Sequence, residues 1–207
     1  MNASQDKVDL MKSDKLYYQA PQHPVTVELP ELAYLSIEGE GSPDGEGFAS
    51  SAEALYKAAY SAKALSKAAG QDYVVPRLEG LWWVDGNRNG LEVPKEEWRW
   101  KLLIRLPDFV SEAMVETALV QAAAKNKDNA LIGKVSRTLL KEGTCVQMLH
   151  VGPYATEPET LGAMYAYMKR EKLVHNGLHH EIYISDPRRS APEKMKTILR
   201  QPVDSES

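Results

Sequence analysis

The sequence has very little cysteine and no long apolar run. Cys145 is the only cysteine among the 207 residues, so no disulfide can form within the chain. This excludes a disulfide-stabilised secreted scaffold and predicts a reducing, cytoplasmic location. No stretch approaches the roughly 20 apolar residues that span a bilayer. Residues 1–20 lack the apolar core of a signal peptide. We therefore expect no membrane partner.

Excess positive charge is also missing. The chain carries 25 Lys and Arg against 29 Asp and Glu, which gives a formal net charge of −4. Binding to nucleic-acid phosphates needs clustered basic residues. Arg188, Arg189, Lys194 and Lys196 are too scattered along the chain to predict such a patch. A nucleic-acid partner is therefore not expected.

Metal-binding motifs do not occur in the sequence. Neither Cys-x-x-Cys nor His-Glu-x-x-His spacing is present. His179 and His180 are adjacent, so in a strand they point to opposite faces and cannot chelate one ion together. His150 is typical of a buried core histidine, and Cys145, in an apolar strand, of an unreactive thiol. We expect no metal and no cofactor.

What the chain does contain is an internal repeat. Residues 78–85 (LEGLWWVD) correspond to residues 179–186 (HHEIYISD), and each stretch precedes a second matching strand. Residues 98–107 (WRWKLLIRLP) correspond to residues 193–202 (EKMKTILRQP), with Lys, Arg and Pro at equivalent positions. The position equivalent to Glu181 in the first copy is Gly80. The pattern predicts two diverged copies of one unit with a pocket between them.

The order of elements predicts an α+β fold. Each copy reads strand, helix, strand, strand, which favours one mostly antiparallel sheet. We expect the helices on one face of this sheet and a ligand groove on the other. Residues 1–22 form a polar N-terminal segment, and residues 23–203 form one domain. Within that domain we place the first repeat at about 23–108, a bridging helix at about 111–126 and the second repeat at about 133–203.

Strand alternation singles out Glu181 as a candidate functional residue. His179, Glu181 and Tyr183 share one face of their strand, and in the first copy Gly80 and Trp82 fall on the same face. The isoleucines of the opposite face are expected to pack under the helices, which leaves the Glu181 face open. A carboxylate among aromatic residues could hold a cationic ligand or act as a general base on water. The alternative is a half-exposed surface glutamate.

The aromatic composition of the chain also favours a ligand-binding site. The chain has four Trp and ten Tyr but only two Phe, and Trp and Tyr combine a ring for stacking with a polar group for a ligand. Trp98 and Trp100 alternate together, away from the charged side chains of their strand. Burial in the core is the common fate of a large tryptophan, so each ring could belong to the core or to a ligand cage.

The motifs taken together resemble the GyrI-like small-molecule-binding family. The resemblance rests on residues 78–83 (LEGLWW), 145–154 (CVQMLHVGPY) and 179–189 (HHEIYISDPRR), and it extends from about residue 24 to 203. The resemblance implies a pair of strand-helix-strand-strand units. In drug-sensing relatives a glutamate in an aromatic pocket meets cationic ligands, and the matching position here is Glu181. Because the resemblance takes up nearly all of these 207 residues, we do not expect the helix-turn-helix domain that transcriptional relatives carry.

The LEGLWW motif is closer to a stand-alone branch, which resembles the cyclopropanoid cyclopropyl hydrolases. That resemblance implies hydrolysis of DNA-alkylating cyclopropanoid compounds in an aromatic cage, a form of xenobiotic detoxification. Glu181 and Tyr183 would be catalytic, with His179 as another possible donor to the ligand carbonyl. The residues expected to bind the planar or cationic ligand are Trp82, Trp100, Tyr154 and His179.

Two other functions remain open from the sequence. The protein could bind and sequester drugs without chemistry, or touch a protein partner such as gyrase. Haem binding is a weaker possibility, because a related haem-binding family shares the fold and yet no residue here marks an axial ligand. The oligomeric state and the physiological ligand are left open.

Overall fold

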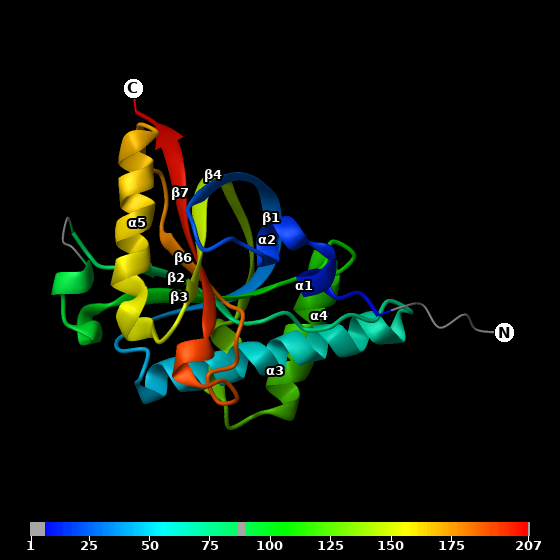
Figure 1. Cartoon of the computed structure of the whole chain (residues 1–207). Coiled ribbons are helices and arrows are strands. Elements are labelled where there is room, and N and C mark those ends of the chain that lie inside the picture. The colour runs from blue at the N-terminus through cyan, green and yellow to red at the C-terminus, as the bar shows by residue number, and fades with distance from the viewer. Residues whose placement is uncertain (1–6, 87–89, 207) are drawn as a thin grey trace.

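The computed structural model describes residues 7–86 and 90–206. Its α-helices are α1 (Leu10–Ser13), α2 (Lys15–Tyr18), α3 (Glu46–Ala68), α4 (Glu112–Lys125) and α5 (Glu157–Arg170). Its strands are β1 (Val25–Glu40), β2 (Glu79–Trp83), β3 (Arg99–Arg105), β4 (Ser136–Val151), β5 (Leu173–His175), β6 (His179–Tyr183) and β7 (Lys196–Ser205). Short 3-10 helices are η1 (Gly90–Glu92), η2 (Lys95–Glu97), η3 (Ala130–Lys134), η4 (Tyr154–Thr156) and η5 (Pro192–Lys194). Figure 1 shows α5 standing beside the strands of the second half while α3 crosses below them.

The predicted repeat and the α+β class are confirmed. The first copy is β1-α3-β2-β3, the second is β4-α5-β6-β7, and α4 connects the two. In the first copy β1 and β2 both pair with β3, and in the second copy β4 and β6 both pair with β7. The copies join through β1–β4 and β2–β6, so each joint is made by equivalent strands. A pseudo-two-fold relationship between the halves follows from this pairing.

The named strands pair antiparallel and close on themselves. The order is β4-β1-β3-β2-β6-β7-β5, and an additional β4–β7 pairing completes a ring with β5 at its edge. β1 and β4 are single long strands that continue past Pro30 and Gly143. Pro30 has no N–H to donate, and it has no pairing partner where Leu29 meets Gly143 and Glu31 meets Lys141. The pairing of β1 with β4 therefore continues on both sides of one unpaired position.

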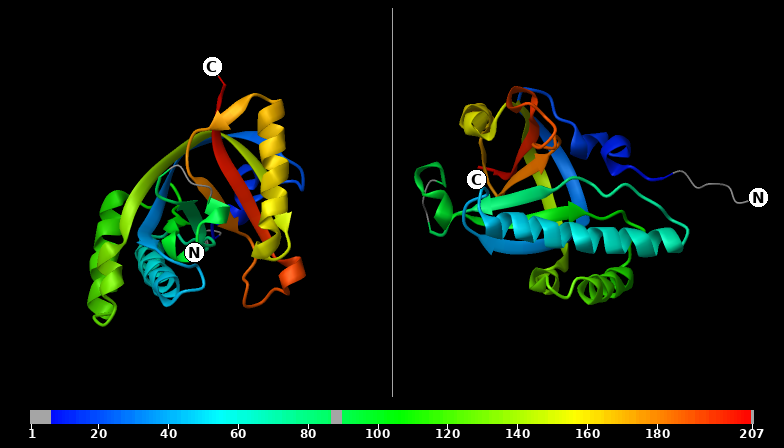
Figure 2. Two further views of the ribbon diagram at one scale, coloured as in Figure 1. Left: turned by 90° about the vertical axis from the view of Figure 1, so that its left-hand side faces the viewer. Right: turned by 90° about the horizontal axis from the view of Figure 1, so that it is seen from below.

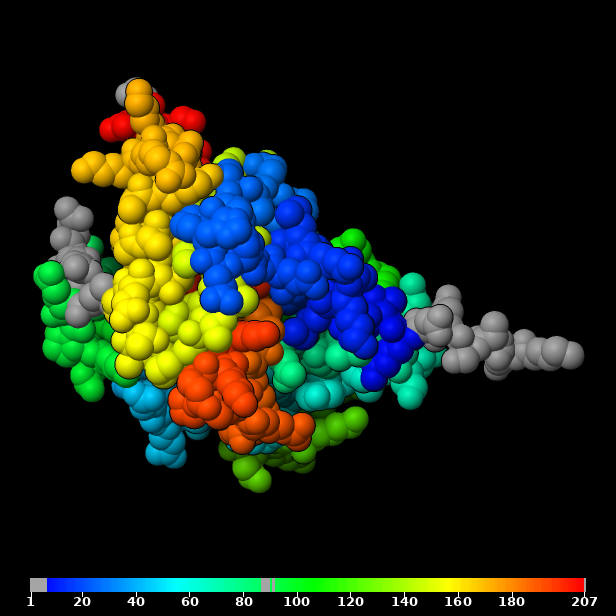
Figure 3. Space-filling view, viewed as in Figure 1, coloured from blue at the N-terminus to red at the C-terminus, as the bar shows by residue number. Residues whose placement is uncertain are grey.

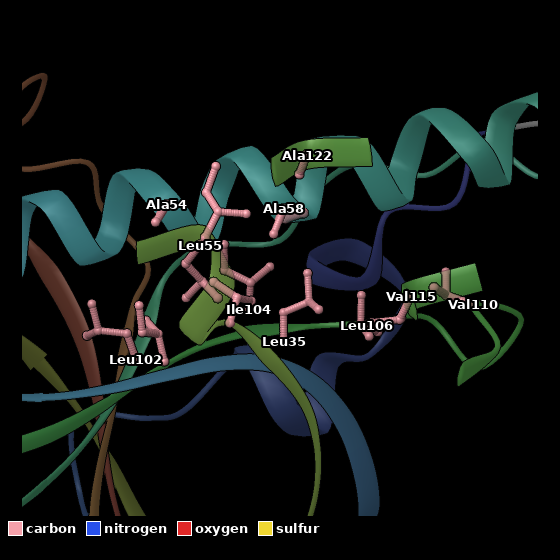
Figure 4. Close-up of a cluster of buried hydrophobic side chains, with 14 of the residues drawn as sticks. Leu35, Ala54, Leu55, Ala58, Leu102, Ile104, Leu106, Val110, Val115 and Ala122 are labelled. Carbon is pink, nitrogen blue, oxygen red and sulfur yellow. The ribbon is translucent and has the colours of Figure 1, made fainter. Parts of the chain in front are cut away.

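The helix of the first copy packs on the outer face of the ring. Its alanine- and leucine-rich side buries Ala54, Leu55 and Ala58 against Leu35 and Ile104. Figure 4 shows these side chains pointing toward one another between α3 and the strands. Small residues on α3 allow close packing against the sheet, and each buried leucine contributes about 1.5–3 kcal/mol. This layer fixes one wall of the site described below.

The inside of the ring is filled by a second core that contains charge. Tyr17 and Tyr18 enter it from α2, so this part of the predicted N-terminal segment belongs to the folded body. Figure 3 shows the N-terminal helices, in dark blue, lying across one face of the molecule. The guanidinium carbons of Arg105 and Arg200, which are equivalent in the two copies, lie 4.6 and 4.3 Å from the Tyr17 ring centre. Residues 1–6 lie outside the described residues.

A buried ionic network connects the strands inside the ring. His180 Nδ1 lies 2.9 Å from Glu142 Oε1, and its Nε2 lies 3.0 Å from Glu79 Oε2. Arg200 Nη1 donates to Glu142 Oε2 over 3.1 Å. Burial by itself lowers the pKa of His180, but the charge and hydrogen bonds of the two glutamates outweigh it and raise that pKa to about 9. His180 is therefore a charged structural residue, on the face opposite His179 as alternation predicted.

Candidate functional site

The site is a large groove on the outer face of the ring. It has a volume of about 2180 Å³, and its floor includes Trp82 from β2 together with Glu181 and Tyr183 from β6. The walls come from α3 on one side and from η4 and α5 on the other. In the left view of Figure 2, α3 and α5 stand on either side of the middle strands. The predicted Glu181 face therefore does carry the groove.

The groove and the helices share one face of the sheet, which differs from the expected arrangement. Leu102 and Glu181 both pair with Gly80, and Leu199 pairs with Glu181, so these side chains point to the same face. Leu102 packs under α3, and Leu199 packs in the core beneath α5. Each helix covers the outer strands of its own copy and leaves β2 and β6 uncovered between them. The isoleucine face points instead into the ring, where Ile182 is buried with Tyr17.

Glu181 is held by a chain of hydrogen bonds that crosses from one copy to the other. Trp82 Nε1 donates to Tyr183 Oη over 3.1 Å, and Tyr183 Oη donates to Glu181 Oε2 over 2.8 Å. His179 Nε2 lies 3.5 Å from the other carboxylate oxygen. The side chains of His179 and Glu181 are 19% and 15% exposed, so both lie deep in the groove. These contacts orient the carboxylate and stabilise negative charge on it.

The side chain of Tyr183 keeps its phenolic proton at neutral pH. Burial, and then the negative charge of Glu181, raise the pKa of Tyr183 well above its usual value. It therefore donates a hydrogen bond rather than accepting a proton. His179 Nδ1 is buried and has no hydrogen-bond partner among the described residues. Sequence alternation correctly placed both side chains beside Glu181.

Aromatic rings line the groove around this polar centre. Phe48 of α3 stacks on Trp82 at a centroid distance of 5.8 Å and an angle of 15°. Trp98 meets Trp82 edge to face, also at 5.8 Å. On the other wall Tyr154, which is 43% exposed, meets Tyr183 edge to face at 6.1 Å. Burial, followed by the charges of Glu181 and Glu157, raises the pKa of Tyr154 to about 12.

Trp100 does not reach the groove, which corrects its expected place in the cage. It is 2% exposed and belongs to the core under α3. Its ring fills the space above its strand partner Gly39, where a Cβ would lie only 2.2 Å from the indole. Its Nε1 donates to the Gly41 carbonyl over 3.2 Å. Trp98, two residues earlier, lines the groove instead and held the same parity in the sequence.

Glu157 is a second groove carboxyl that the sequence reasoning missed. It is the first residue of α5, is 8% exposed and lines the groove near Glu181. Burial, and then the charge of Glu181, raise the pKa of Glu157 to about 9. In the sequence, the signal for it is its place in the first turn of a helix, directly after the cap residue Thr156. Its neutral form at pH 7 sets it apart from an ordinary surface glutamate.

His150 and Cys145 are buried outside the groove. His150 is buried, with Nδ1 2.8 Å from Thr160 Oγ1, as predicted for a core histidine. Burial raises the pKa of Cys145 to about 12, which agrees with an unreactive thiol. Within residues 7–86 and 90–206, no group of three or more His, Cys, Asp and Glu side chains could hold a metal ion. No helix in these ranges is long and apolar enough to cross a membrane.

A duplicated α+β fold with an aromatic groove and a fixed carboxylate on its floor defines a small-molecule-binding domain. The chain belongs to the GyrI-like family, because the model of the GyrI-like small molecule binding domain matches residues 22–203. This is the family that the sequence motifs resembled. None of the curated proteins compared matches the chain.

Solved structures of similar chains agree with this assignment. An uncharacterised conserved protein from Listeria innocua is 39% identical, with a TM-score of 0.89 over 96% of this chain and 100% of the other. A hydrolase from Listeria innocua is also 39% identical, with a TM-score of 0.84 and the same coverage. The C-terminal domain of EcmrR is 13% identical, with a TM-score of 0.57 over 88% of this chain and 98% of that domain. At this identity, the last likeness concerns the fold alone.

Proposed function

We propose that this protein binds planar aromatic or cationic small molecules in the groove and hydrolyses cyclopropanoid DNA-alkylating compounds there. The observation that carries the proposal is the carboxylate of Glu181, held by Tyr183 and His179 and surrounded by aromatic rings. A fixed carboxylate in a partly desolvated site can take a proton from water. Aromatic rings on the walls can hold a flat ligand by stacking.

The reaction needs one water molecule and no redox partner. Glu181 takes a proton from water while the water oxygen forms a bond to a methylene carbon of the strained ring. The carbon–carbon bond of the cyclopropane breaks, and its electron pair moves into the conjugated dienone. The carbonyl oxygen then becomes a phenol oxygen once it receives a proton. The product is the ring-opened alcohol, in which the attacked carbon carries the hydroxyl group and no longer alkylates DNA.

The remaining side chains of the site orient the Glu181 carboxylate and contact the ligand. Tyr183 donates to Glu181 and so fixes the direction in which the carboxylate presents its free lone pairs. His179 Nδ1 is free to donate to, or accept from, a ligand heteroatom. Trp82 on the floor and Trp98 beside it offer ring faces and edges to a ligand, and Tyr154 does so from the opposite wall. Stacking on such a ring contributes about 1–3 kcal/mol, by analogy with nucleobase binding.

Similarity to a hydrolase supports the catalytic form of the proposal. The hydrolase from Listeria innocua shares 39% identity over 96% of this chain. Detoxification of a xenobiotic in the cytoplasm is the corresponding biological role, and it remains a prediction. A gyrase-interacting role likewise remains a prediction from the family resemblance.

Binding without chemistry is the second candidate function, and the size of the groove favours it. A volume of about 2180 Å³ exceeds the roughly 300–1,000 Å³ of an ordinary ligand pocket. The acidic side chains of Glu53 on the α3 wall and Glu181 on the floor would suit large cationic ligands of varied shape. In that case the protein lowers the free concentration of a drug and leaves it intact.

Incubation with an activated spirocyclopropyl cyclohexadienone separates the two functions. A hydrolase converts it to a product heavier by one water, detected by mass spectrometry, faster than the buffer or heat-denatured protein does. A binding protein retains the unchanged compound and protects it from solvolysis. Recovery of the intact compound at full stoichiometry, with no water adduct above the buffer rate, would rule out the hydrolytic proposal.

A further inference from the structure

Glu157 is placed where an unpaired acidic side chain is costly. It begins α5 and is only 8% exposed in the groove wall. Its Oε1 is buried and has no hydrogen-bond partner among the described residues. The Thr197 hydroxyl on β7 is its hydrogen-bonding neighbour. Glu157 lines the groove, so a bound ligand can supply the hydrogen bond that this oxygen lacks.

The strand register brings this carboxyl to the same point as Glu181. Thr197 is the direct cross-strand partner of Tyr183, and Tyr183 donates to Glu181. Glu157 therefore approaches the Glu181–Tyr183 pair from the helix side, while these two residues rise from the floor. Both carboxyl groups line the groove, and burial, followed by the charge of Glu181, raises the pKa of Glu157 to about 9. Two carboxyl groups from different elements thus share one end of the groove.

The other ionisable groups around Glu157 do not neutralise it. Glu181, Tyr183 and His179 face the site from β6, Tyr154 from η4, and Asp186 from the loop after β6. Among the described residues, no Lys or Arg forms an ion pair with Glu157. The positive end of α5 favours a charged first residue, yet burial and Glu181 outweigh it here. Two nearby acids in different environments suit opposite roles in one reaction.

We propose that Glu157 is the proton donor of the groove and that Glu181 is its proton acceptor. This inference rests on the proposed hydrolytic function and narrows its substrate class. The substrate is one in which attack of water on carbon pushes an electron pair onto a conjugated carbonyl oxygen. Glu157 delivers its proton to that oxygen as the negative charge develops. An acid in this position makes the phenol directly and avoids a buried phenolate beside Glu181.

In this reaction Glu181 takes up one proton and Glu157 releases one. Water gives one proton to Glu181 and its oxygen to the ring carbon, and the carbon–carbon bond breaks. Glu157 gives one proton to the carbonyl oxygen and becomes a carboxylate. After release of the product, the proton on Glu181 passes to Glu157, directly or through a solvent molecule. The starting state is restored, with one water consumed and no other reactant needed.

The first experiment detects the proton on Glu157 without any ligand. Infrared spectra of the free protein should show the carbonyl stretch of a protonated carboxylic acid near neutral pH, and it should disappear as the pH rises through about 9. Glu157→Gln should remove this band. Glu159→Gln is the matched control, because Glu159 lies in the same first turn of α5 but is exposed and outside the groove. A wild-type spectrum without the band would overturn the proposal.

The second experiment measures turnover of the spirocyclopropyl dienone against pH. General acid catalysis is worth about 100- to 10,000-fold, so Glu157→Gln should lose at least about 100-fold in kcat. It should also lose the alkaline decline that the wild type shows near pH 9. Glutamine keeps the shape and can still donate a hydrogen bond, so affinity for an unreactive planar dienone should change by only a few-fold. Glu159→Gln should behave as wild type in all three measurements.

Each remaining outcome has one meaning. If Glu157→Gln keeps both its rate and its alkaline decline, the proton comes from elsewhere and the inference is wrong. If the decline persists in Glu157→Gln and disappears in His179→Gln, His179 is the donor. If the wild type shows the protonated-acid band but never forms the water adduct, the hydrolytic function fails. Glu157 would in that case be a neutral donor in a binding site, and the two failures are thereby distinguished.

Discussion

Gly80 and Glu181 are direct cross-strand partners at the joint between the two copies of the repeat. They are also equivalent positions of that repeat, so the pseudo-symmetry places them side by side. A Cβ on Gly80 would lie 2.8 Å from Trp82 Nε1 and 3.0 Å from Tyr183 Oη. The first copy therefore contributes space, and the second contributes the carboxylate. This asymmetry allows the Trp82–Tyr183–Glu181 chain to form.

Substitution of Gly80 by alanine should disturb the site and the fold together. The added methyl group has to push apart Trp82 and Tyr183, and overpacking of this kind costs about 1–3 kcal/mol. We expect a lower melting temperature and a loss of ligand affinity, measured by calorimetry and by quenching of tryptophan fluorescence. Gly47→Ala is the control, because nothing lies within 4 Å of a Cβ there. Equal behaviour of the two variants would contradict the assigned role of Gly80.

Glu181→Gln should remove turnover and leave the fold intact. The change keeps the volume and one hydrogen-bond acceptor for Tyr183, but the amide cannot take a proton from water. A drop of about 100- to 10,000-fold in kcat is expected, with little change in melting temperature. Glu31→Gln, on the exposed part of β1, provides the same change of charge away from the groove. Full activity of Glu181→Gln toward a confirmed substrate would remove this residue from the mechanism.

Trp98 and Trp100 should respond to truncation in opposite ways. Trp100→Ala opens a cavity in the core and should cost about 3–5 kcal/mol of unfolding free energy. Trp98→Ala removes a groove ring and should weaken a planar ligand by roughly 5- to 150-fold, since stacking is worth about 1–3 kcal/mol. Urea unfolding and ligand titration on both variants check the pair. If folded Trp100→Ala loses ligand affinity and Trp98→Ala does not, Trp100 would be a ligand-binding residue after all.

The network inside the ring should make stability fall at alkaline pH. The pKa of His180 is raised to about 9 in the folded protein, so its contribution is complete below about pH 6.5 and is lost as the pH rises through 9. The loss should be on the order of 3 kcal/mol. Unfolding by urea between pH 6 and 10 measures it, and His180→Gln should flatten the curve. An equally steep decline in that variant would assign the effect to another group.

The same network should also fail in acid. Burial by itself raises the pKa of Glu142, but the charges of His180 and Arg200 outweigh it and lower that pKa to about 2. Its contribution is present above about pH 4.5 and is lost as the pH falls through 2. Arg200→Met leaves Glu142 with one cation fewer and should cost about 3–5 kcal/mol near neutral pH. Wild-type stability in Arg200→Met would show that the network is not needed.

The sequence by itself determined the repeat, the order of elements and the face on which Glu181 lies. These features depend on local rules, because strand alternation has a period of two and helical faces a period near 3.6. The equivalence of Gly80 and Glu181 could be read directly from the matched stretches. Even the joint between the copies follows, once equivalent strands are allowed to pair.

Only the tertiary structure decided which side chains share the groove. Parity assigned Trp98 and Trp100 to one face, but closure of the ring put one against Gly39 in the core and the other on the wall. The helices could have covered either face, and the inner face was instead filled by Tyr17 from the N-terminal segment. Glu157 keeps its proton because it is buried near Glu181, which lies 24 residues further along the chain. Such long-range packing depends on how distant segments meet, and local sequence periodicity carries no record of it.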